Sequence, residues 1–300
     1  MRSYTHTAVV AAATPPSPPS WAGDSVDWSG APRYTRPHRP RCPLTPSVRS
    51  FVREQVPGLA GKVLARVRPC VNASSRKRPD GSIPVGHSKL GGRPDVPEGF
   101  EWPTRRGVPC WFLAQFNLRE LRRPSVGFPL PRAGLLSFFY HDDNGLPGPG
   151  SRVYHFPAKG LRRVEVVADR RYEGLQGRHL YPRELTLSQG YCLPRDIRQY
   201  ALTRRERAAW DDPADPRGPA VVGRERDAYE DFHYFWEVFH NRFAPASHRL
   251  FGLSPYDPPP RGHQLLASFG QMEDRLNFYV PGEDVETLQF GRLRVTYECT

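Results

Sequence analysis

The sequence repeats itself, and this repetition constrains the fold more than any other feature. Three short blocks occur in the first half of the chain and return in the same order in the second half. They are a turn with glycine and proline, an apolar strand-like segment and an aromatic strand-like segment. One such match is weak, but three in order indicate an internal duplication. The paired blocks are residues 88–94 and 248–252, 112–116 and 265–269, and 136–140 and 276–280.

The repeated segments have the length and composition of β-strands. Residues 110–118 and 135–141 are dense in large apolar side chains and are bounded by proline and glycine, as strands often are. Residues 152–156 and 162–167 read as further strands, and residues 142–145 have the chemistry of a turn. The sequence therefore predicts an α+β protein with mostly antiparallel β-sheets in a duplicated arrangement and a few flanking helices.

Side-chain alternation assigns faces to the first repeated strand. Every second residue of a strand points to the same side. Phe112 and the residues in step with it, Ala114, Phe116 and Leu118, are predicted to form one apolar core face. The opposite face begins with Trp111 and Leu113 and ends with two amides, Gln115 and Asn117, which need partners if they are buried. These amides either brace a neighbouring loop or line a pocket.

Helices are predicted before and between the two repeats. Thr45 followed by Pro46 is a good helix start, and an apolar stripe runs from there to Pro57, with a second short helix over residues 59–67. The middle of the chain reads as helical, with short candidates at 195–199 and 203–210. The clearest helix spans residues 224–243, where aromatic side chains recur at helical spacing, which is typical of a core-facing stripe.

The domain organisation follows from these elements. Residues 1–44 are rich in proline, alanine, serine and arginine without a sustained period, and are predicted to be a disordered leader. Residues 45–300 are expected to form one domain. Within it, the first repeat spans about 69–167, a helical insert about 195–243 and the second repeat about 247–298.

Charge and cysteine usage narrow the possible partners. The formal net charge is +12, and the basic residues are nearly all arginines in short dispersed pairs. Nucleic-acid binding through phosphate contacts is one alternative, but a coding bias toward arginine and solvated surface charge explain the pattern equally well.

The five cysteines are odd in number and scattered, with no C-x-x-C pair, which favours reduced thiols in a reducing compartment over a disulfide framework.

The sequence shows neither a membrane nor a secretion signal. No apolar run approaches the length of a membrane span, and the apolar residues 8–13 are cut off by Thr14-Pro15-Pro16, which is too short for a signal-peptide core. We therefore expect a cytoplasmic protein with no membrane partner.

One histidine-carboxylate triplet has the spacing of a possible metal site. His233, Glu237 and His240 are spaced by four and three residues, so they share one side of the predicted helix and could ligate zinc. The adjacent His-Glu pair of zinc proteases is missing, and no fourth ligand is evident. The sequence therefore predicts no metal site and no cofactor.

The best candidate for a ligand site lies at the repeated turns. Lys89 precedes Gly91 and Gly92 in the first copy, and Arg249 precedes Gly252 in the second. A cation beside a glycine turn can present positive charge and backbone N–H groups to one anion. With Gln115 and Asn117 to orient the ligand, the predicted ligand-binding residues are Lys89, Gly91, Gly92, Gln115, Asn117 and Arg249. The alternative is that the glycines serve a tight turn and the cations are solvated or locally paired.

Several of these motifs carry a family resemblance. Residues 88–94, 112–118 and 134–139, together with Val96-Pro97 and Trp102-Pro103, resemble the YwqG-like family, domain of unknown function 1963. Residues 248–252 and 265–280 are similar to its second half, and Leu288-Gln289-Phe290 to its closing segment. The second half departs from the family at Ser268 and at residues 272–274. The resemblance implies a duplicated, mostly antiparallel α+β fold and no established activity.

These observations favour an intracellular bacterial binding or interaction protein over an enzyme. The sequence has no G-x-S-x-G elbow, P-loop or dinucleotide fingerprint. The expected partner is another protein or a small anionic ligand. Two alternatives remain at this point: an enzyme with a site between the repeats, and a protein associated with nucleic acid through its dispersed arginines.

Overall fold

The computed structural model describes most of the chain after its first 43 residues. The described residues are 44–121, 130–143, 146–147, 150–165, 181–204, 206, 228–254, 259–271 and 274–298. All of them belong to one unit of the chain, Thr35–Thr300. The predicted disordered leader, residues 1–44, lies outside the described residues except for Leu44.

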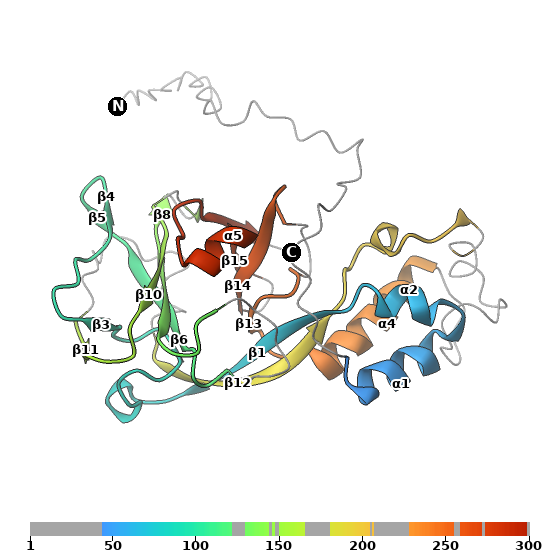
Figure 1. Ribbon diagram of the computed structural model, residues 1–300, viewed down its shortest axis with the longest axis horizontal. Helices are drawn as coiled ribbons and strands as arrows, with labels where there is room; N and C mark the ends of the chain where they lie inside the picture. The colour runs from blue at the N-terminus through green and yellow to red at the C-terminus, as the bar shows by residue number, and fades with distance from the viewer. Residues whose placement is uncertain are drawn as a thin grey trace, which may run out of the picture. The chain divides into compact units, whose positions relative to one another are not determined.

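One curled antiparallel sheet of ten strands organises the described residues (Figure 1). Its strand order is β10-β7-β6-β2-β12-β1-β13-β14-β15-β16, and each neighbouring pair is antiparallel. This arrangement confirms the predicted α+β class. In chain order the strands are β1 (Arg68–Lys77), β2 (Lys89–Leu90), β6 (Trp111–Asn117), β7 (Leu135–Tyr140), β10 (Arg152–Phe156), β12 (Arg183–Cys192), β13 (His248–Leu250), β14 (His263–Gln271), β15 (Asp274–Pro281) and β16 (Arg294–Glu298).

Three two-stranded ribbons accompany the large sheet in the described residues. They are β3 (Asp95–Pro97) with β11 (Leu161–Arg163), β4 (Thr104–Arg105) with β5 (Val108–Pro109), and β8 (Asp142–Asp143) with β9 (Leu146–Pro147). Of the turn predicted at residues 142–145, Asp142 and Asp143 form β8, and residues 144–145 lie outside the described residues.

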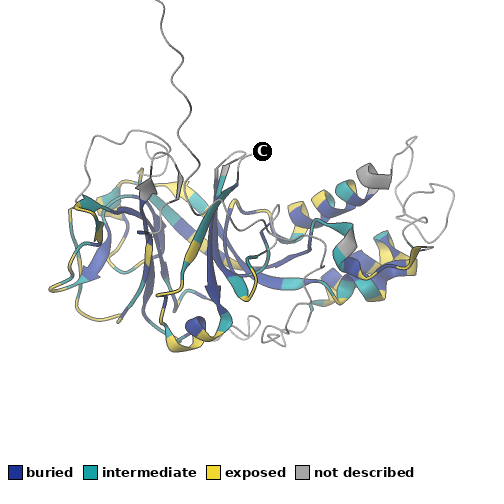
Figure 2. Ribbon diagram, turned by 90° about the horizontal axis from the view of Figure 1, so that it is seen from above, coloured by how far each residue is buried: buried dark blue, intermediate teal, exposed yellow. Residues whose placement is uncertain are grey.

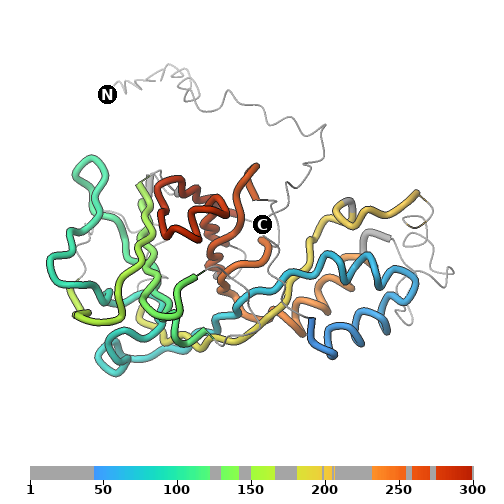
Figure 3. The backbone as a smooth tube through the Cα atoms, viewed as in Figure 1, coloured from blue at the N-terminus to red at the C-terminus, as the bar shows by residue number. Residues whose placement is uncertain are grey.

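The central strand β12 was not predicted. It pairs with β1 along ten residues, from Arg68 opposite Cys192 to Lys77 opposite Arg183, and the two strands run side by side along their length (Figure 3). The sequence does contain a signal for this strand, because the apolar Leu185 and Leu187 alternate with the polar Thr186 and Ser188, as in a half-buried strand. In the structure the two leucines are buried and the two polar residues are exposed. The predicted helical insert begins at about residue 195, after β12, so this strand is an addition to the prediction.

A β-bulge corrects the predicted faces of β6. The pairing of β6 with β7 shifts between Phe112 and Ala114, so Leu113 is an extra residue and alternation is interrupted there. Ala114 and Phe116 point into the central core as predicted, but Phe112 packs on the other side of the sheet with Leu135 and Phe139. An assignment of faces that assumes strict side-chain alternation does not predict such an extra residue.

The two halves of the sheet have the same register of pairs. In the first half Leu90 lies opposite Ala114 and Ala114 opposite Phe138. In the second half Leu250 lies opposite Ala267 and Ala267 opposite Phe278. Both central strands carry their bulge at the residue before that alanine, Leu113 and Leu266.

The core joins the halves across the concave side of the sheet. Phe116 and Phe138 of the first half contact Phe269 of the second, with ring centroids 5.9 and 5.2 Å apart. Phe138 also contacts Phe278 edge to face at 5.2 Å. Because these side chains are fully buried, they supply much of the apolar burial that holds the two halves together. Figure 2 shows the strands as mostly buried.

Helices α1 (Pro46–Gln55), α2 (Ala60–Leu64) and α4 (Ala228–Phe243) pack together beside the ends of β1 and β12 (Figure 1), whereas α5 (Gly282–Thr287) lies against β14 and β15. Helix α1 starts after Thr45 and buries Val48, Phe51 and Val52, as predicted. The predicted long helix is α4, and its Phe232, Trp236 and Phe239 are buried. The remaining helical elements are the short 3-10 turns η2 (Pro57–Leu59), η3 (Asp80–Ser82) and η5 (Ile197–Tyr200).

No helix among the described residues has both the length and the apolar character that a membrane span requires.

Candidate functional site

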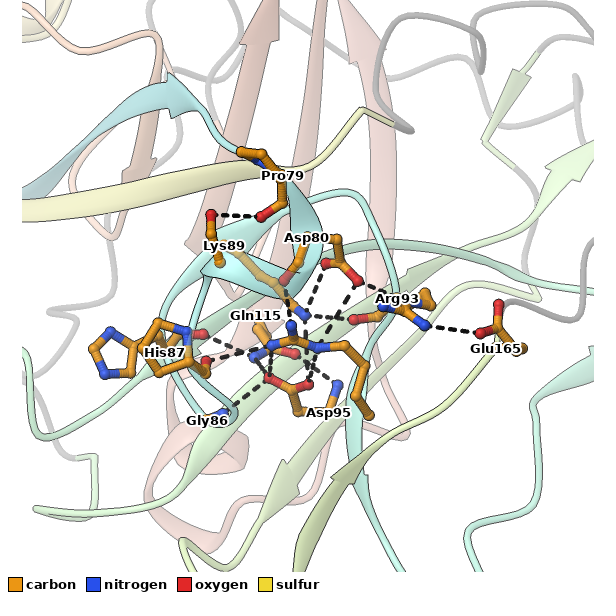
Figure 4. Close-up of polar contacts among 12 residues, drawn as sticks. Pro79, Asp80, Gly86, His87, Lys89, Arg93, Asp95, Gln115 and Glu165 are labelled. Carbon is orange, nitrogen blue, oxygen red and sulfur yellow. Dashed lines mark hydrogen bonds and ion pairs between the residues drawn. The ribbon is translucent and has the colours of Figure 1, made fainter.

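Lys89 is fully buried and ion-paired (Figure 4). Its neighbour Leu90 faces the central core, so the Lys89 side chain points to the opposite face of the sheet. Its Nζ lies 3.4 Å from Oδ1 of Asp80 and 3.4 Å from Oδ1 of Asp95, and it donates to the carbonyl of Arg93 at 2.5 Å. The cation nominated from the sequence therefore already has two carboxylate partners.

Two arginines complete this group, which we call the Lys89 cluster. Arg163 of β11 contacts both oxygens of Asp95, at 2.8 and 3.3 Å. Arg93 binds Asp80 at 2.8 Å and reaches out to the exposed Glu165 at 2.9 Å. The cluster thus has three cations and three carboxylates. Its members are Asp80, Lys89, Arg93, Asp95, Arg163 and Glu165 (Figure 4).

The cluster shifts the pKa of its buried members. Burial alone would raise the pKa of Asp80 and of Asp95, but hydrogen bonds from the arginines and the charge of Lys89 outweigh it, so both pKa values lie below the ordinary range. Burial lowers the pKa of Lys89, and the two carboxylates oppose this only in part. The cluster is an internally neutralised ionic network, which suits a structural role.

The nominated amides brace the adjoining loop. Gln115 donates to the carbonyl of His87 at 2.8 Å and to Asp95 at 2.7 Å, and it accepts from the backbone N–H of Asp95 at 3.0 Å. Asn117 donates to the carbonyl of Gly86 at 2.8 Å and accepts from the backbone of Arg119. Of the two alternatives weighed from the sequence, the geometry matches the bracing role.

The nominated glycines also have local partners. Gly91 and Gly92 both have a positive φ, 62° and 70°, which favours glycine. The N–H of Gly91 donates to Leu113 at 2.8 Å. A Cβ on Gly92 would stand 2.5 Å from Oδ1 of Asp80. Gly92 is therefore required so that the turn can approach the Asp80 carboxylate.

Arg249 has different surroundings. Leu250 faces the central core, so Arg249, like Lys89, points to the opposite face, and it is only 4% exposed. Its Nε and Nη1 atoms have no hydrogen-bond partner among the described residues. An arginine buried in this way is costly unless its donors are satisfied. No carboxylate of the described residues forms an ion pair with it.

Arg249 belongs to a row of polar residues that crosses four strands. It lies opposite Ser268, which lies opposite Asn277, which in turn lies opposite Thr296. Directly opposed residues share a face of a sheet, so these four side chains form what we call the Arg249 row. Asn277 Oδ1 and Thr296 Oγ1 are buried and also have no hydrogen-bond partner in the described part of the chain.

The orientation of the Asn277 amide follows from its neighbours. The hydroxyl of Ser254 lies 2.6 and 2.8 Å from the two carboxylate oxygens of Glu298. A serine has one proton to donate, and Glu298 takes it, so Asn277 donates its Nδ2 to that hydroxyl, at 3.4 Å. The unsatisfied atom of Asn277 is therefore its acceptor, Oδ1.

Two cysteines and a histidine lie near Arg249. Cys70 and Cys192 are fully buried. Burial would raise the pKa of Cys192, but its hydrogen bond with Cys70 and the charge of Arg249 lower it on balance. Burial, with the charge of Arg249, lowers the pKa of His240 to about 3, so this imidazole is neutral. Its Nδ1 donates to the carbonyl of Trp236 at 2.9 Å, and its Nε2 accepts from Leu193 at 3.4 Å.

The structure thus divides the predicted site into two places. Lys89, Gln115 and Gly92 lie at the Asp80 and Asp95 carboxylates of the Lys89 cluster. Gly91 and Asn117 bond to the backbone beside it, whereas Arg249 lies beyond β12 and β1 in the strand order. The weighed metal triplet also divides, because His233 pairs with Glu237 at 3.0 Å and His240 makes separate backbone hydrogen bonds. Ligand binding by any of these residues stays a prediction.

Sequence reasoning missed several members of both places. They are Asp80, Asp95 and Arg163 in the Lys89 cluster, and Asn277, Cys70 and Cys192 around Arg249. Asn277 had a signal, since it is a polar residue inside an aromatic strand and aligns with Ser137 in the repeat. No sequence signal marks Asp80 and Arg163, because their hydrogen bond joins residues that lie 83 positions apart.

The fold and these two clusters define an antiparallel α+β protein with buried charge on both halves of one sheet. The family described as Domain of unknown function (DUF1963) matches residues 88–253. This match covers more than half of the chain, so the chain belongs to that family, as the resemblance predicted. A search of curated proteins found no match.

Proposed function

We propose that this chain is a cytoplasmic bacterial binding protein in which Arg249 takes an anionic group of a small molecule or a partner protein. The observation that carries this proposal is the buried Arg249 guanidinium, whose Nε and Nη1 lack a hydrogen-bond partner in the described residues.

The physical argument starts from the cost of burying a charge. A desolvated cation is tolerated when carboxylates and hydrogen bonds compensate it. Asp80 and Asp95 do this for Lys89, and no ion pair among the described residues does it for Arg249. The planar guanidinium matches the two oxygens of a carboxylate or a phosphate. Nε and Nη1 lie on different edges of that plane, so an external carboxylate or phosphate would accept from one of them and a second acceptor would satisfy the other.

The rest of the Arg249 row supports a second contact with the same ligand. Asn277 offers an acceptor, Oδ1, and stands two strands away from Arg249, which corresponds to about 10 Å at ordinary strand spacing. A ligand that carries a hydroxyl, amide or ammonium donor at this separation from its anionic group would satisfy both residues.

We also propose that the two halves of the sheet are an internal duplication. The matching registers and matching bulges of the two halves support it. On this basis Lys89 and Arg249 are equivalent positions, of which the first pairs with carboxylates of its own chain and the second binds an anion from outside. The Lys89 part of the predicted ligand site then serves the fold.

The test is a thermal-unfolding titration of the full chain at constant ionic strength. The probes are inorganic phosphate, acetate and glycolate, the last of which adds a hydroxyl donor to acetate. We expect phosphate or glycolate to raise the Tm of the wild type, because a ligand that binds only the folded state stabilises it. Arg249→Gln should lose this shift, while the exposed Arg261 serves as the matched control in Arg261→Gln.

The outcomes separate site binding from general charge effects. A shift that survives in Arg261→Gln and disappears in Arg249→Gln supports the proposal. Equal shifts in both variants would mean that the anions act through the net positive charge of the chain. The proposal is abandoned if none of the three probes changes the wild-type Tm.

A further inference from the structure

Cys70 and Cys192 form a contacting pair of thiols on one face of the sheet. Cys70 lies opposite Gly190 and Cys192 lies opposite Arg68, so the two cysteines are diagonal neighbours on adjacent antiparallel strands. Their side chains approach the same point, because a Cβ built on Gly252 would lie within 2.8 Å of both Cys192 Sγ and Cys70 Cβ. Both are fully buried and belong to one cluster with Ala244. The thiol of Cys192 donates to the carbonyl of Arg68 at 3.5 Å, and the thiol of Cys70 donates to Oδ1 of Asn72 at 3.9 Å.

A glycine turn presses against both cysteines. Gly252 has φ of +85°, and a Cβ at this position would stand 2.6 Å from Cys192 Sγ and 2.8 Å from Cys70 Cβ. The backbone N–H of Leu253, the next residue, donates to Cys192 Sγ at 3.1 Å. Hydrogen-bond donation to sulfur favours the charged thiolate.

The first half of the sheet shows what this position can hold. Gly92 follows Lys89 by three residues, as Gly252 follows Arg249. The atom nearest to Gly92 is Oδ1 of Asp80, at 2.5 Å, and the atom nearest to Gly252 is Cys192 Sγ, at 2.6 Å. The sulfur of Cys192 therefore occupies the place of a carboxylate beside a buried cation.

The two thiols are electrostatically unequal. The charges of Arg249 and Arg68 act on Cys192, and its pKa is lowered even though burial works against this. The hydrogen bond with Cys192 and burial raise the pKa of Cys70 well above its ordinary value. Cys192 is thus the member of the pair that ionises more readily.

We propose that Cys70 and Cys192 are a reversible thiol-disulfide pair, in which Cys192 reacts first with a small hydroperoxide and Cys70 resolves the product. This inference does not depend on ligand binding at Arg249. In the first step the Cys192 thiolate attacks the peroxide, an S–O bond forms, the O–O bond breaks, and the leaving hydroxide becomes water by taking a proton from solvent.

In the second step the Cys70 sulfur attacks the sulfenic acid on Cys192. The S–S bond forms, the S–O bond breaks, and the hydroxyl leaves as water with the proton of Cys70. Two thiols lose two electrons in total, and one peroxide is reduced to water. A small oxidant is required because both sulfurs are buried, and buried cysteines react only as far as reagents reach them.

The experiment uses the reduced full chain, freed of reductant and exposed to one equivalent of hydrogen peroxide. After quenching with an alkylating reagent under denaturing conditions, peptide mapping should show a disulfide-linked pair of peptides containing Cys70 and Cys192. In Cys70→Ser, Cys192 should stop at the sulfenic acid and be trapped by dimedone. In Cys192→Ser, Cys70 should remain alkylatable.

A charge variant separates this chemistry from simple proximity. Arg249→Gln should slow the oxidation of Cys192 several-fold, whereas Arg249→Lys, which keeps the charge, should slow it less. Thermal melting checks that each variant is folded. The proposal is overturned if both cysteines stay reduced in the folded wild type and oxidise only after denaturation. It is also overturned if the disulfide formed links one of them to Cys42, Cys110 or Cys299 instead.

Discussion

The Lys89 cluster and the Arg249 row each contain a buried cation at corresponding points of the two halves of the sheet. The two cations differ in whether carboxylates of the described residues pair with them. Lys89 has two carboxylates of its own chain within 3.4 Å, and the surrounding arginines are paired as well. Arg249 is almost as buried, but thiols and a neutral histidine surround it. Burial alone therefore does not show whether a cation stabilises the fold or binds a ligand. That depends on whether a carboxylate of the same chain pairs with it.

The largest effect is expected in the Lys89 cluster. Asp95→Asn would remove the charge that compensates Lys89 and Arg163 and would turn an amide N–H toward their donors. Breaking one side of a buried ion pair costs about 3–5 kcal/mol, so the free energy of unfolding should fall by that amount in equilibrium denaturation. Glu237→Gln, at an exposed helix pair, is the control. A loss below about 1 kcal/mol would show that the network is not stabilised by charge.

The glycines that follow the two cations should respond alike. Gly252→Ala and Gly92→Ala place a Cβ within 2.6 Å of Cys192 or Asp80 at a positive φ. Left-handed backbone costs about 1–2 kcal/mol and overpacking adds about 1–3 kcal/mol. Gly262→Ala is the matched control, because its φ is +76° and nothing lies within 4 Å. If all three variants lose equal stability, crowding by the sulfur or the carboxylate is unimportant.

The pH dependence of stability should report on the Arg249 side. The pKa of His240 is about 3 in the folded chain and about 6.5 when unfolded, so protons favour the unfolded state between these values. Stability is fully present above about pH 6.5 and falls with decreasing pH, by about 1.4 kcal/mol per pH unit for this one group. His240→Gln should flatten the curve between about pH 6 and 4. Parallel curves for wild type and variant would contradict the burial of a neutral imidazole.

The smallest effect is expected at the rim of the Lys89 cluster. Glu165 is 83% exposed and pairs with Arg93, which is itself partly exposed. Because exposed ion pairs contribute little, Glu165→Ala should leave the Tm unchanged within error. A clear drop in Tm would extend the network to its exposed edge and make the two halves differ even more.

Much of the secondary structure could be predicted from local patterns. The start of α1 follows from Thr45 and Pro46, and the buried face of α4 follows from its aromatic spacing. The strands β6 and β7 followed from apolar density between turn residues. These features are encoded within a few neighbouring residues, which is why sequence alone was sufficient.

The parts that failed depend on distant residues. The bulge at Leu113 is a property of the pairing between two strands. The partners of Lys89 are Asp80 in the turn η3, Asp95 in the short strand β3 and the carbonyl of Arg93 just before that strand. Nothing near Arg249 in the sequence indicates that it is buried without a carboxylate. The site residues were therefore found as residue types, whereas their electrostatic roles needed the fold.

The most direct test compares two substitutions of the buried cations. Lys89→Met and Arg249→Met both keep an apolar stem and remove the charge. We expect Lys89→Met to lower the free energy of unfolding by about 3 kcal/mol or more, because Asp80 and Asp95 lose a partner, and Arg249→Met to change it by less than about 1 kcal/mol or to raise it. Equilibrium denaturation at neutral pH without added anions measures both. Equal losses in the two variants would show that Arg249 has an internal counter-charge, and would contradict its assignment as the residue that receives an external anion.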